Sequence, residues 1–185
     1  MLMHRAAAIL FLLLTFGLIA CNRQQPDSTR QPGSTTILIL RHAEKASDAD
    51  DSPLAEAGIQ RAQALVRVAE GAGVSAIYSS QFKRNLDTAK PLSDRLGIPV
   101  TQVPVNLTSP SEYGKMLAKE IVEKHSGQVI VVVGHSNTIA STIEELAGRE
   151  YPIESVEYSD IYIVTIPPSG EGGVIKVQYG LKNGG

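Results

Sequence analysis

The chain has 185 residues, of which 43% are hydrophobic, and carries 17 basic against 19 acidic side chains for a formal net charge of −2. This length is enough for one domain with one core. The slightly acidic balance gives no sign of a nucleic-acid-binding surface, and a single cysteine excludes an internal disulfide.

The first twenty residues are predicted to be a secretory signal outside the fold. After His4 and Arg5, residues 6–20 are almost unbroken apolar sequence, which is short for a membrane span and typical of a signal h-region. The segment ends directly before Cys21, the only cysteine, and in this it resembles a bacterial lipoprotein signal. The resemblance implies that Cys21 is lipidated and becomes the new N-terminus. An ordinary signal peptide or membrane anchor that happens to contain a cysteine is the alternative.

Residues 21–34 are predicted to be the lipidated cysteine and a flexible tether, because residues 22–34 contain two prolines and no larger apolar side chain. Thirteen residues reach up to about 45 Å when fully extended. Acyl chains would hold the protein on a membrane. Asn22 after the cysteine resembles outer-membrane sorting, so we expect a bacterial cell envelope location, on the periplasmic side of the outer membrane or another extracytoplasmic face.

Residues 35–185 are expected to form one domain in which strands alternate with helices. In chain order the predicted elements are a strand at 36–40, a helix at 54–70, a strand at 74–78, a helix at 83–96, an extended segment at 99–105, a helix at 111–125, a strand at 129–133, a helix at 137–147, and two late strands at 160–166 and 174–179. Ser52-Pro53 is expected to start the first helix, and Pro91 to kink or break the second. This order implies a three-layer α/β domain, with a largely parallel sheet and helices on both faces.

Cationic and imidazole side chains follow three of the predicted strands. Arg41 and His42 come directly after the first strand, Arg84 lies shortly after the second, and His135 follows the strand at 129–133. Ligands of such sheets bind beyond the carboxyl ends of the strands. We therefore expect these four side chains to converge at one edge of the sheet.

Two arginines and two histidines suit the chemistry of a phosphoryl group. A neutral imidazole can attack phosphorus and carry the group covalently. Arginine matches a phosphate with two parallel donors, and a protonated second histidine could donate to the same oxygens. A further group must protonate the leaving oxygen.

Three motifs resemble those of the histidine phosphatase superfamily, which includes cofactor-dependent phosphoglycerate mutases and bacterial phosphohistidine phosphatases. They are Arg41-His42-Ala43-Glu44-Lys45, the stretch Ser79-Ser80-x-x-x-Arg84-x-x-x-Thr88-Ala89, and Gly134-His135-Ser136-Asn137. The similarity extends from about residue 35 to 166.

The resemblance implies a phosphoglycerate mutase-like fold with His42 as the phosphorylated nucleophile. Arg41, Arg84 and His135 would complete the phosphate pocket, with no metal or other cofactor. The substrate would be a small-molecule phosphate ester or a phosphoprotein. Hydrolysis is favoured over mutase activity, because no insertion is evident that would exclude water during a second transfer.

The proton donor departs from the family pattern, because His135 is followed by Ser136 where acid-type phosphatases carry Asp. Glu112 is the only carboxylate between residues 100 and 113 and is the candidate donor, with Glu44 as an alternative. Glu112 could equally serve the first turn of its helix. A missing strong acid would suit good leaving groups, as in phosphohistidine or an acyl phosphate. Ala55 also replaces the usual threonine cap of the first helix, which bears on stability.

Two other readings compete with the phosphatase. A lipoprotein could keep the phosphate pocket without turnover and bind a phosphorylated ligand or partner. An esterase reading rests on a nucleophile elbow at Ser136, but no histidine follows Ser136, as that fold requires. His125 is interpreted as a structural helix-end residue, and Lys45 and Lys83 as solvated or as steering an anionic substrate. The sequence leaves the physiological substrate and the oligomeric state open.

Overall fold

The computed structural model describes residues 33–106, 108–153, 157–170 and 172–180, all within one compact unit that spans residues 32–185. The predicted signal sequence, Cys21 and nearly all of the tether lie outside the described residues. Their boundaries and the lipidation therefore stay predictions. None of the helices in the described part is both long and apolar enough to cross a membrane.

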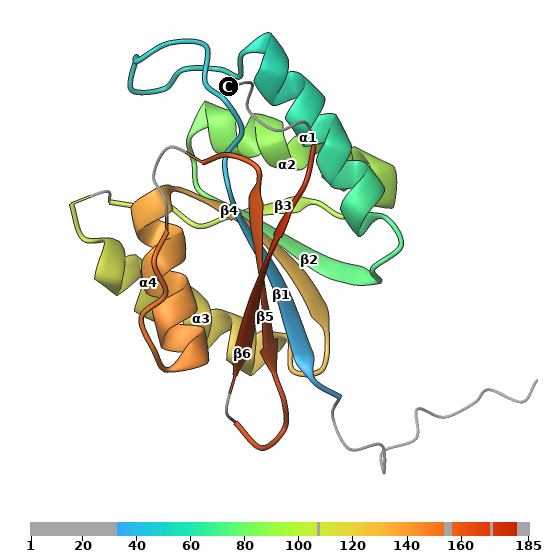
Figure 1. Ribbon diagram of the computed structural model, residues 1–185, viewed down its shortest axis with the longest axis vertical. Helices are drawn as coiled ribbons and strands as arrows, with labels where there is room; N and C mark the ends of the chain where they lie inside the picture. The colour runs from blue at the N-terminus through green and yellow to red at the C-terminus, as the bar shows by residue number, and fades with distance from the viewer. Residues whose placement is uncertain (1–32, 107, 154–156, 171, 181–185) are drawn as a thin grey trace, which may run out of the picture. The chain divides into compact units, whose positions relative to one another are not determined.

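The described residues form six strands and four helices (Figure 1). In chain order they are β1 (Thr35–Arg41), α1 (Glu56–Ala69), β2 (Val74–Ser79), α2 (Lys83–Leu96), β3 (Val100–Gln102), α3 (Pro110–Lys124), β4 (Val129–Gly134), α4 (Ser136–Ala147), β5 (Asp160–Ile166) and β6 (Gly173–Gln178). Every predicted strand and helix is therefore present, with small shifts at the ends.

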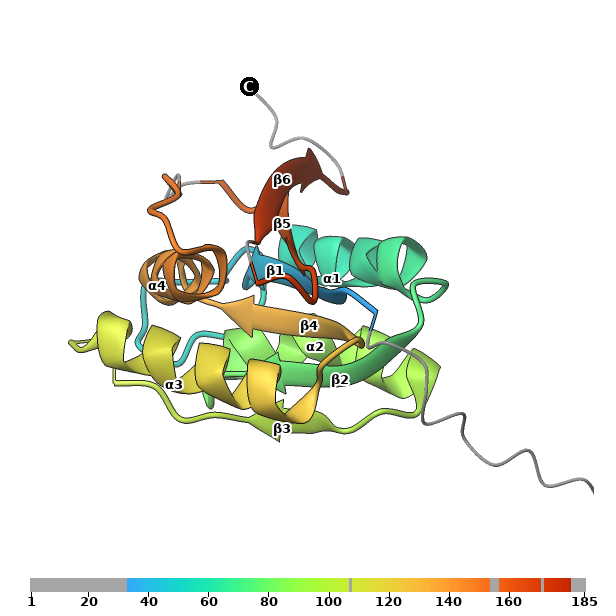
Figure 2. The same cartoon turned by 90° about the horizontal axis from the view of Figure 1, so that it is seen from below.

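The strands form one sheet in the order β3-β2-β4-β1-β5-β6, with β3 and β6 at opposite edges (Figure 2). The first four of these strands are parallel, whereas β5 runs antiparallel to β1, and β6 pairs with β5 as a hairpin. The prediction of a largely parallel sheet is confirmed, and the late strand pair makes the sheet mixed.

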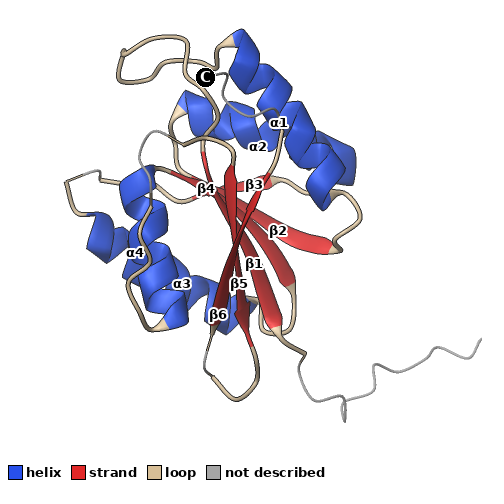
Figure 3. Cartoon of the chain, in the orientation of Figure 1, coloured by secondary structure: helices blue, strands red, loops and turns tan. Residues whose placement is uncertain are grey.

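Both faces of the sheet are buried at its centre, which explains the continuous apolar runs at residues 37–40 of β1 and 129–133 of β4. Along β1, Ile37 and Ile39 pack toward α3 and α4, while Leu38 and Leu40 pack toward α1 and α2. The two helix pairs lie on opposite sides of the sheet (Figure 3). This three-layer arrangement is the one expected from the sequence.

The start of α1 was predicted wrongly. The helix begins at Glu56 after an extended Ala55, and not at Ser52-Pro53. The Ser52 hydroxyl instead accepts the Ser47 N–H at 2.9 Å, and Leu54 forms an isolated antiparallel bridge with Lys45. These local bonds hold residues 45–54 as a loop.

One further expectation differs from the structure. Helix α2 continues through Pro91 without ending there, so the predicted break is absent. Only residues 100–102 of the extended segment at 99–105 pair as a strand.

Candidate active site

The ends of three adjacent parallel strands lie level with one another at the carboxyl edge of the sheet. In the register of β1 and β4, Arg41 lies opposite Gly134, and in that of β2 and β4, Ser79 lies opposite Val133. The His42 N–H donates to the Gly134 carbonyl oxygen at 2.9 Å, which extends the pairing one residue past β1. The residues that follow β1, β2 and β4 therefore lie close together at this edge, although they are distant in sequence.

A cavity of about 710 Å³ opens at this edge, and the structure brings Arg41, His42, Arg84 and His135 together in its lining. The remaining lining residues are Lys45, Asp48, Ala49, Asp50, Phe82, Val105, Asn106 and Ser136. Ser136 is the first residue of α4. The positive end of that helix dipole therefore adds to the two arginines in favouring an anion.

His42 is held as a neutral imidazole with a defined tautomer. Its Nδ1 lies 2.8 Å from the Ala43 carbonyl oxygen. A carbonyl can only accept, so Nδ1 carries the proton and Nε2 keeps its lone pair. Burial lowers the pKa of His42 to about 4, and the charges of Arg41, Arg84 and Lys45 act in the same direction against the Ala43 hydrogen bond. Near neutral pH, the Nε2 lone pair of His42 is thus available for nucleophilic attack without further activation.

His135 lies beside His42, with 5.4 Å between the ring centroids. Its Nδ1 is 3.4 Å from Arg84 Nη2, and its Nε2 is 3.1 Å from the Ser80 hydroxyl. A guanidinium can only donate, so Nδ1 accepts and Nε2–H donates to Ser80. Burial, followed by the neighbouring His42 and Arg84, lowers the pKa of His135 to about 3. The protonated second histidine that the sequence allowed is therefore not the resting form.

Arg84 lines the cavity and is only 8% exposed. Nη1 donates to the Asp50 carbonyl oxygen at 2.6 Å, and the guanidinium carbon lies 4.6 Å from the centre of the Phe82 ring. The Nε–H is buried and, within the part of the chain that the structure describes, makes no hydrogen bond. A buried donor left unpaired is costly. Its presence in a cationic cavity indicates an anionic ligand.

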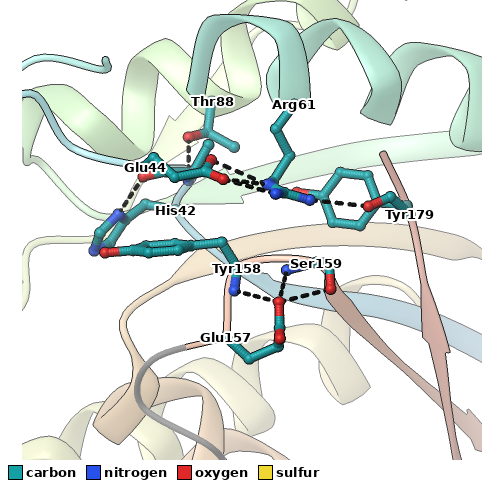
Figure 4. Close-up of polar contacts among 9 residues, drawn as sticks. His42, Glu44, Arg61, Thr88, Glu157, Tyr158, Ser159 and Tyr179 are labelled. Atoms are coloured by element: carbon teal, nitrogen blue, oxygen red, sulfur yellow. Dashed lines mark hydrogen bonds and ion pairs between the residues drawn. The ribbon is translucent and has the colours of Figure 1, made fainter. Parts of the chain in front are cut away.

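Sequence reasoning missed Tyr158, which lies in the connection from α4 to β5. Its ring centre is 4.1 Å from the Arg41 guanidinium carbon and 5.8 Å from the centre of the His42 ring. Figure 4 shows the Tyr158 ring beside the His42 imidazole, and the two ring planes are tilted by 53°. Tyr158 was missed because the segment before residue 160 shows no periodicity of a helix or strand and because Tyr158 belongs to no motif.

A network of hydrogen bonds and one ion pair holds residues 43 and 44, directly after His42 (Figure 4). The Ala43 N–H donates to the Thr88 hydroxyl at 2.9 Å, and the Glu44 carboxylate is paired with Arg61 at 2.6 Å. Arg61 also donates to the Tyr179 carbonyl oxygen at 3.0 Å. A side chain on Gly58 would collide with the Glu44 carbonyl oxygen, which explains the glycine there. The network fixes the backbone that carries the nucleophile.

Neither carboxylate considered as a proton donor lines the cavity. Glu112 is exposed on the first turn of α3, where it suits the helix dipole. Glu44 is committed to Arg61. The carboxylates at the cavity are Asp48 and Asp50, and the pKa of Asp48 is lowered by its hydrogen bond and ion pair with Lys45.

The remaining candidate residues have ordinary environments. His125 is the C-cap residue of α3, and its Nε2 lies 2.9 Å from the Tyr78 hydroxyl. Lys83 pairs with Asp87 one helical turn away, whereas Lys45 lines the cavity. Across the described ranges, no group of three or more His, Cys, Asp or Glu side chains is arranged to hold a metal ion.

The chain is similar to known phosphatases. A family model for the histidine phosphatase superfamily (branch 1) matches residues 37–105. The solved structure of the protein histidine phosphatase SixA with tungstate aligns with a TM-score of 0.58 at 22% identity, covering 77% of this chain and 96% of that chain. A putative alpha-ribazole-5'-P phosphatase from Escherichia coli aligns with a TM-score of 0.64 at 17% identity, covering 78% and 96%.

A third similar structure is a phosphoserine phosphatase from Entamoeba histolytica in complex with 3-phosphoglyceric acid. It aligns with a TM-score of 0.59 at 17% identity, covering 80% of this chain and 98% of that chain. No curated protein sequence matches the chain. At these identities the structural likeness establishes a shared fold.

Proposed function

We propose that the chain is a member of the histidine phosphatase superfamily, whose model matches residues 37–105, and that it is a metal-independent phosphatase working through a phosphohistidine at His42. One observation carries the proposal. A neutral histidine with its Nε2 lone pair free lies in a cavity with two arginines, one of which has a buried donor without a partner. Positioning and preorganised positive charge are most of what phosphoryl transfer requires.

In the first step, Nε2 of His42 attacks the phosphorus and the bond from phosphorus to the leaving atom breaks. The leaving group departs with the electron pair of that bond and takes its proton from solvent water, and the phosphoryl group stays on Nε2. Arg41 and Arg84 neutralise the charge on the phosphoryl oxygens. In the second step, water attacks the phosphorus, the P–N bond breaks, and inorganic phosphate leaves with His42 neutral again. The arginines and the N-terminus of α4 supply the positive charge, so the scheme uses no metal.

We propose substrates with good leaving groups, such as phosphohistidine or an acyl phosphate. The proposal is supported by the positions of Glu112 and Glu44, neither of which lines the cavity. A leaving group that departs without full protonation depends little on a general acid. One similar structure is a protein histidine phosphatase. Phosphomonoesters, free or on a protein, are the broader class.

The second candidate function is binding without turnover. The absence of Glu112 and Glu44 from the cavity lining favours it, because a pocket that lacks both candidate donors could still hold a phosphorylated ligand. The neutral, oriented His42 favours the enzyme, since binding alone does not need a nucleophile. The two candidates differ in whether a phosphoryl group is transferred.

We also propose that the chain is anchored to a bacterial membrane through lipidated Cys21, at the periplasmic side of the outer membrane or another extracytoplasmic face. The support is the sequence pattern before Cys21. Mass spectrometry of the N-terminal peptide, with Cys21→Ser beside it, tests this proposal. An acylated Cys21 that is lost in the variant is expected, and an unmodified, uncleaved N-terminus would contradict it.

The experiment for the enzyme is hydrolysis of p-nitrophenyl phosphate by the purified chain from pH 4 to 8, with and without EDTA, beside His42→Ala. We expect turnover that resists EDTA and is abolished by the substitution. Turnover that EDTA removes would contradict the metal-independent mechanism. A folded wild type that binds phosphate but turns over neither this ester nor acetyl phosphate would favour the binding protein.

A further inference from the structure

Tyr158 is in contact with two members of the phosphate pocket at once. Its ring lies 4.1 Å from the Arg41 guanidinium carbon, within cation–π range, and tilts toward the His42 ring at 5.8 Å (Figure 4). Arg41 ends β1, and Tyr158 lies just before β5, the antiparallel neighbour of β1. The contact therefore links the end of β1 to the start of the neighbouring strand β5, at the carboxyl edge of the parallel strands.

Hydrogen bonds restrict the turn that carries Tyr158. An oxygen of the Glu157 carboxylate accepts from the Tyr158 N–H at 3.0 Å, from the Ser159 N–H at 2.8 Å and from the Ser159 hydroxyl at 2.6 Å. The Ser159 carbonyl in turn accepts the Tyr179 N–H at 2.9 Å. These bonds tie the backbone directly after Tyr158 to the end of β6.

Holding Arg41 still is useful because its guanidinium must meet phosphate oxygens with little reorganisation. Arg41 and Arg84 are like charges in one cavity, and each acts to lower the pKa of a buried neighbour there. An aromatic face beside Arg41 offsets that repulsion without occupying the donors that phosphate needs. A carboxylate in the same place would compete with the ligand for those donors.

We propose that Tyr158 is a positioning residue of the phosphate pocket, its ring fixing the Arg41 guanidinium and covering one side of the His42 imidazole. The inference rests on the proposed function for its catalytic consequence, although the effect on Arg41 applies to phosphate binding alone. The role belongs to the ring, so phenylalanine should replace tyrosine and an aliphatic side chain should not.

The test compares Tyr158→Phe and Tyr158→Leu with the wild type in the full-length chain. Inorganic phosphate binding is measured by calorimetry, and kcat and KM for p-nitrophenyl phosphate are measured across pH 4 to 8. Tyr158→Leu should weaken phosphate binding and raise KM by about fivefold to tenfold, as expected for loss of one partly desolvated cation–π contact. Tyr158→Phe should stay within about twofold of the wild type.

The pH profile separates positioning from general loss of stability. Removing the ring admits water to His42, whose pKa is lowered first by burial. The acid limb of kcat/KM should therefore move upward in Tyr158→Leu, and not in Tyr158→Phe. The charged and titratable groups that face His42 stay in both variants, namely Arg41, Arg84, Lys45 and His135.

Tyr151 provides a matched control in the same connection. Its ring packs on Tyr162 at 5.5 Å and does not line the cavity. Tyr151→Leu should lower the melting temperature without changing phosphate affinity or the acid limb. If Tyr158→Leu does not fold, Tyr158→Met fills similar volume without an aromatic face and takes its place.

Phosphate affinity and an acid limb that are the same in Tyr158→Leu and the wild type would overturn the inference. So would equal losses in Tyr158→Phe and Tyr158→Leu, because the hydroxyl would then be the active part. The wild type could also bind phosphate without turnover, with binding weakened only in Tyr158→Leu. That result would support the positioning role and contradict the proposed enzymatic function.

Discussion

Nδ1 of His42 lies 2.8 Å from the carbonyl oxygen of Ala43, the next residue in the chain. This hydrogen bond forms within the turn directly after β1. It places the proton on Nδ1 and leaves the lone pair of Nε2 available. The Ala43 N–H is itself fixed by Thr88 at 2.9 Å. The nucleophile is thus oriented by its own backbone, which is in turn held by α2.

The pH dependence of the reaction follows from the neutral state of His42. Burial lowers the pKa of His42 to about 4, so protonation removes the nucleophile only as the pH falls toward that value. We expect the acid limb of kcat/KM near pH 4, well below the ordinary histidine value of about 6.5. The profile is measured with p-nitrophenyl phosphate and corrected for ionisation of the substrate. A limb near 6.5 would show that His42 is solvated in the free enzyme.

Arg84 should be essential in a way that a point charge cannot replace. Its Nη1 donates to the Asp50 carbonyl oxygen and its Nη2 faces His135. Its Nε–H is buried and has no hydrogen-bond partner among the described residues. Arg84→Ala should lower kcat/KM about 100-fold to 1,000-fold, as for loss of a preorganised oxyanion donor. Arg84→Lys should recover only part of this, because lysine lacks the planar fork.

The neighbouring Lys83 is the control for Arg84. It is half exposed and pairs with Asp87 along the helix surface. Lys83→Ala removes a cation one residue away and should change kcat/KM by less than about twofold, since an exposed pair contributes little. Similar losses in Lys83→Ala and Arg84→Ala would point to bulk charge in place of specific contacts.

The Glu44–Arg61 pair should matter mainly for stability. The Arg61 side chain is 5% exposed and that of Glu44 17%, so Arg61→Ala leaves a largely buried carboxylate without its partner. Such a loss costs about 3–5 kcal/mol. For a domain of this size we expect a fall in Tm of about 6–20 °C, measured by circular dichroism.

The exposed Arg95–Glu70 pair offers the comparison for Arg61. Its side chains are 64% and 38% exposed, and its N–O distance of 2.7 Å is similar. Arg95→Ala should cost less than about 1 kcal/mol. Equal destabilisation by the two alanine variants would contradict the view that the chain after His42 depends on a buried clamp.

The carboxyl edge of the sheet could be predicted from the sequence because each part of the signal is local. Unbroken β-branched runs mark the central strands, and the residues directly after them reach the edge. Arg41, His42 and His135 each lie within one residue of a strand end. Arg84 was harder to assign to this edge, because it lies in the first turn of α2 and not directly after a strand.

The parts that sequence reasoning missed depend on contacts between distant segments. Arg61 is an ordinary helix residue until α1 packs against the loop after β1 and the end of β6. Tyr158 belongs to a connection without periodicity, so nothing indicated that its ring reaches Arg41. The tautomers of both histidines likewise depend on partners that only the fold supplies.

Substitution of Glu112 is expected to have little effect on activity, in contrast to substitution of Arg84. The side chain is exposed and does not line the cavity. Glu112→Gln should keep kcat within about twofold of the wild type, as usual for a surface change. The dependence of the rate on leaving-group pKa, measured over a series of aryl phosphates, should also be unchanged. A steeper dependence in the variant would restore Glu112 as the proton donor.

The covalent intermediate is the most direct test of the proposed mechanism. The wild type, His42→Ala and His135→Ala are mixed with acetyl phosphate, quenched in alkali, and examined by peptide mass spectrometry. The mechanism predicts a phosphoryl group on His42 of the wild type and none in His42→Ala. A phosphoryl group on His135 or another residue, or steady-state turnover that persists in His42→Ala, would contradict it.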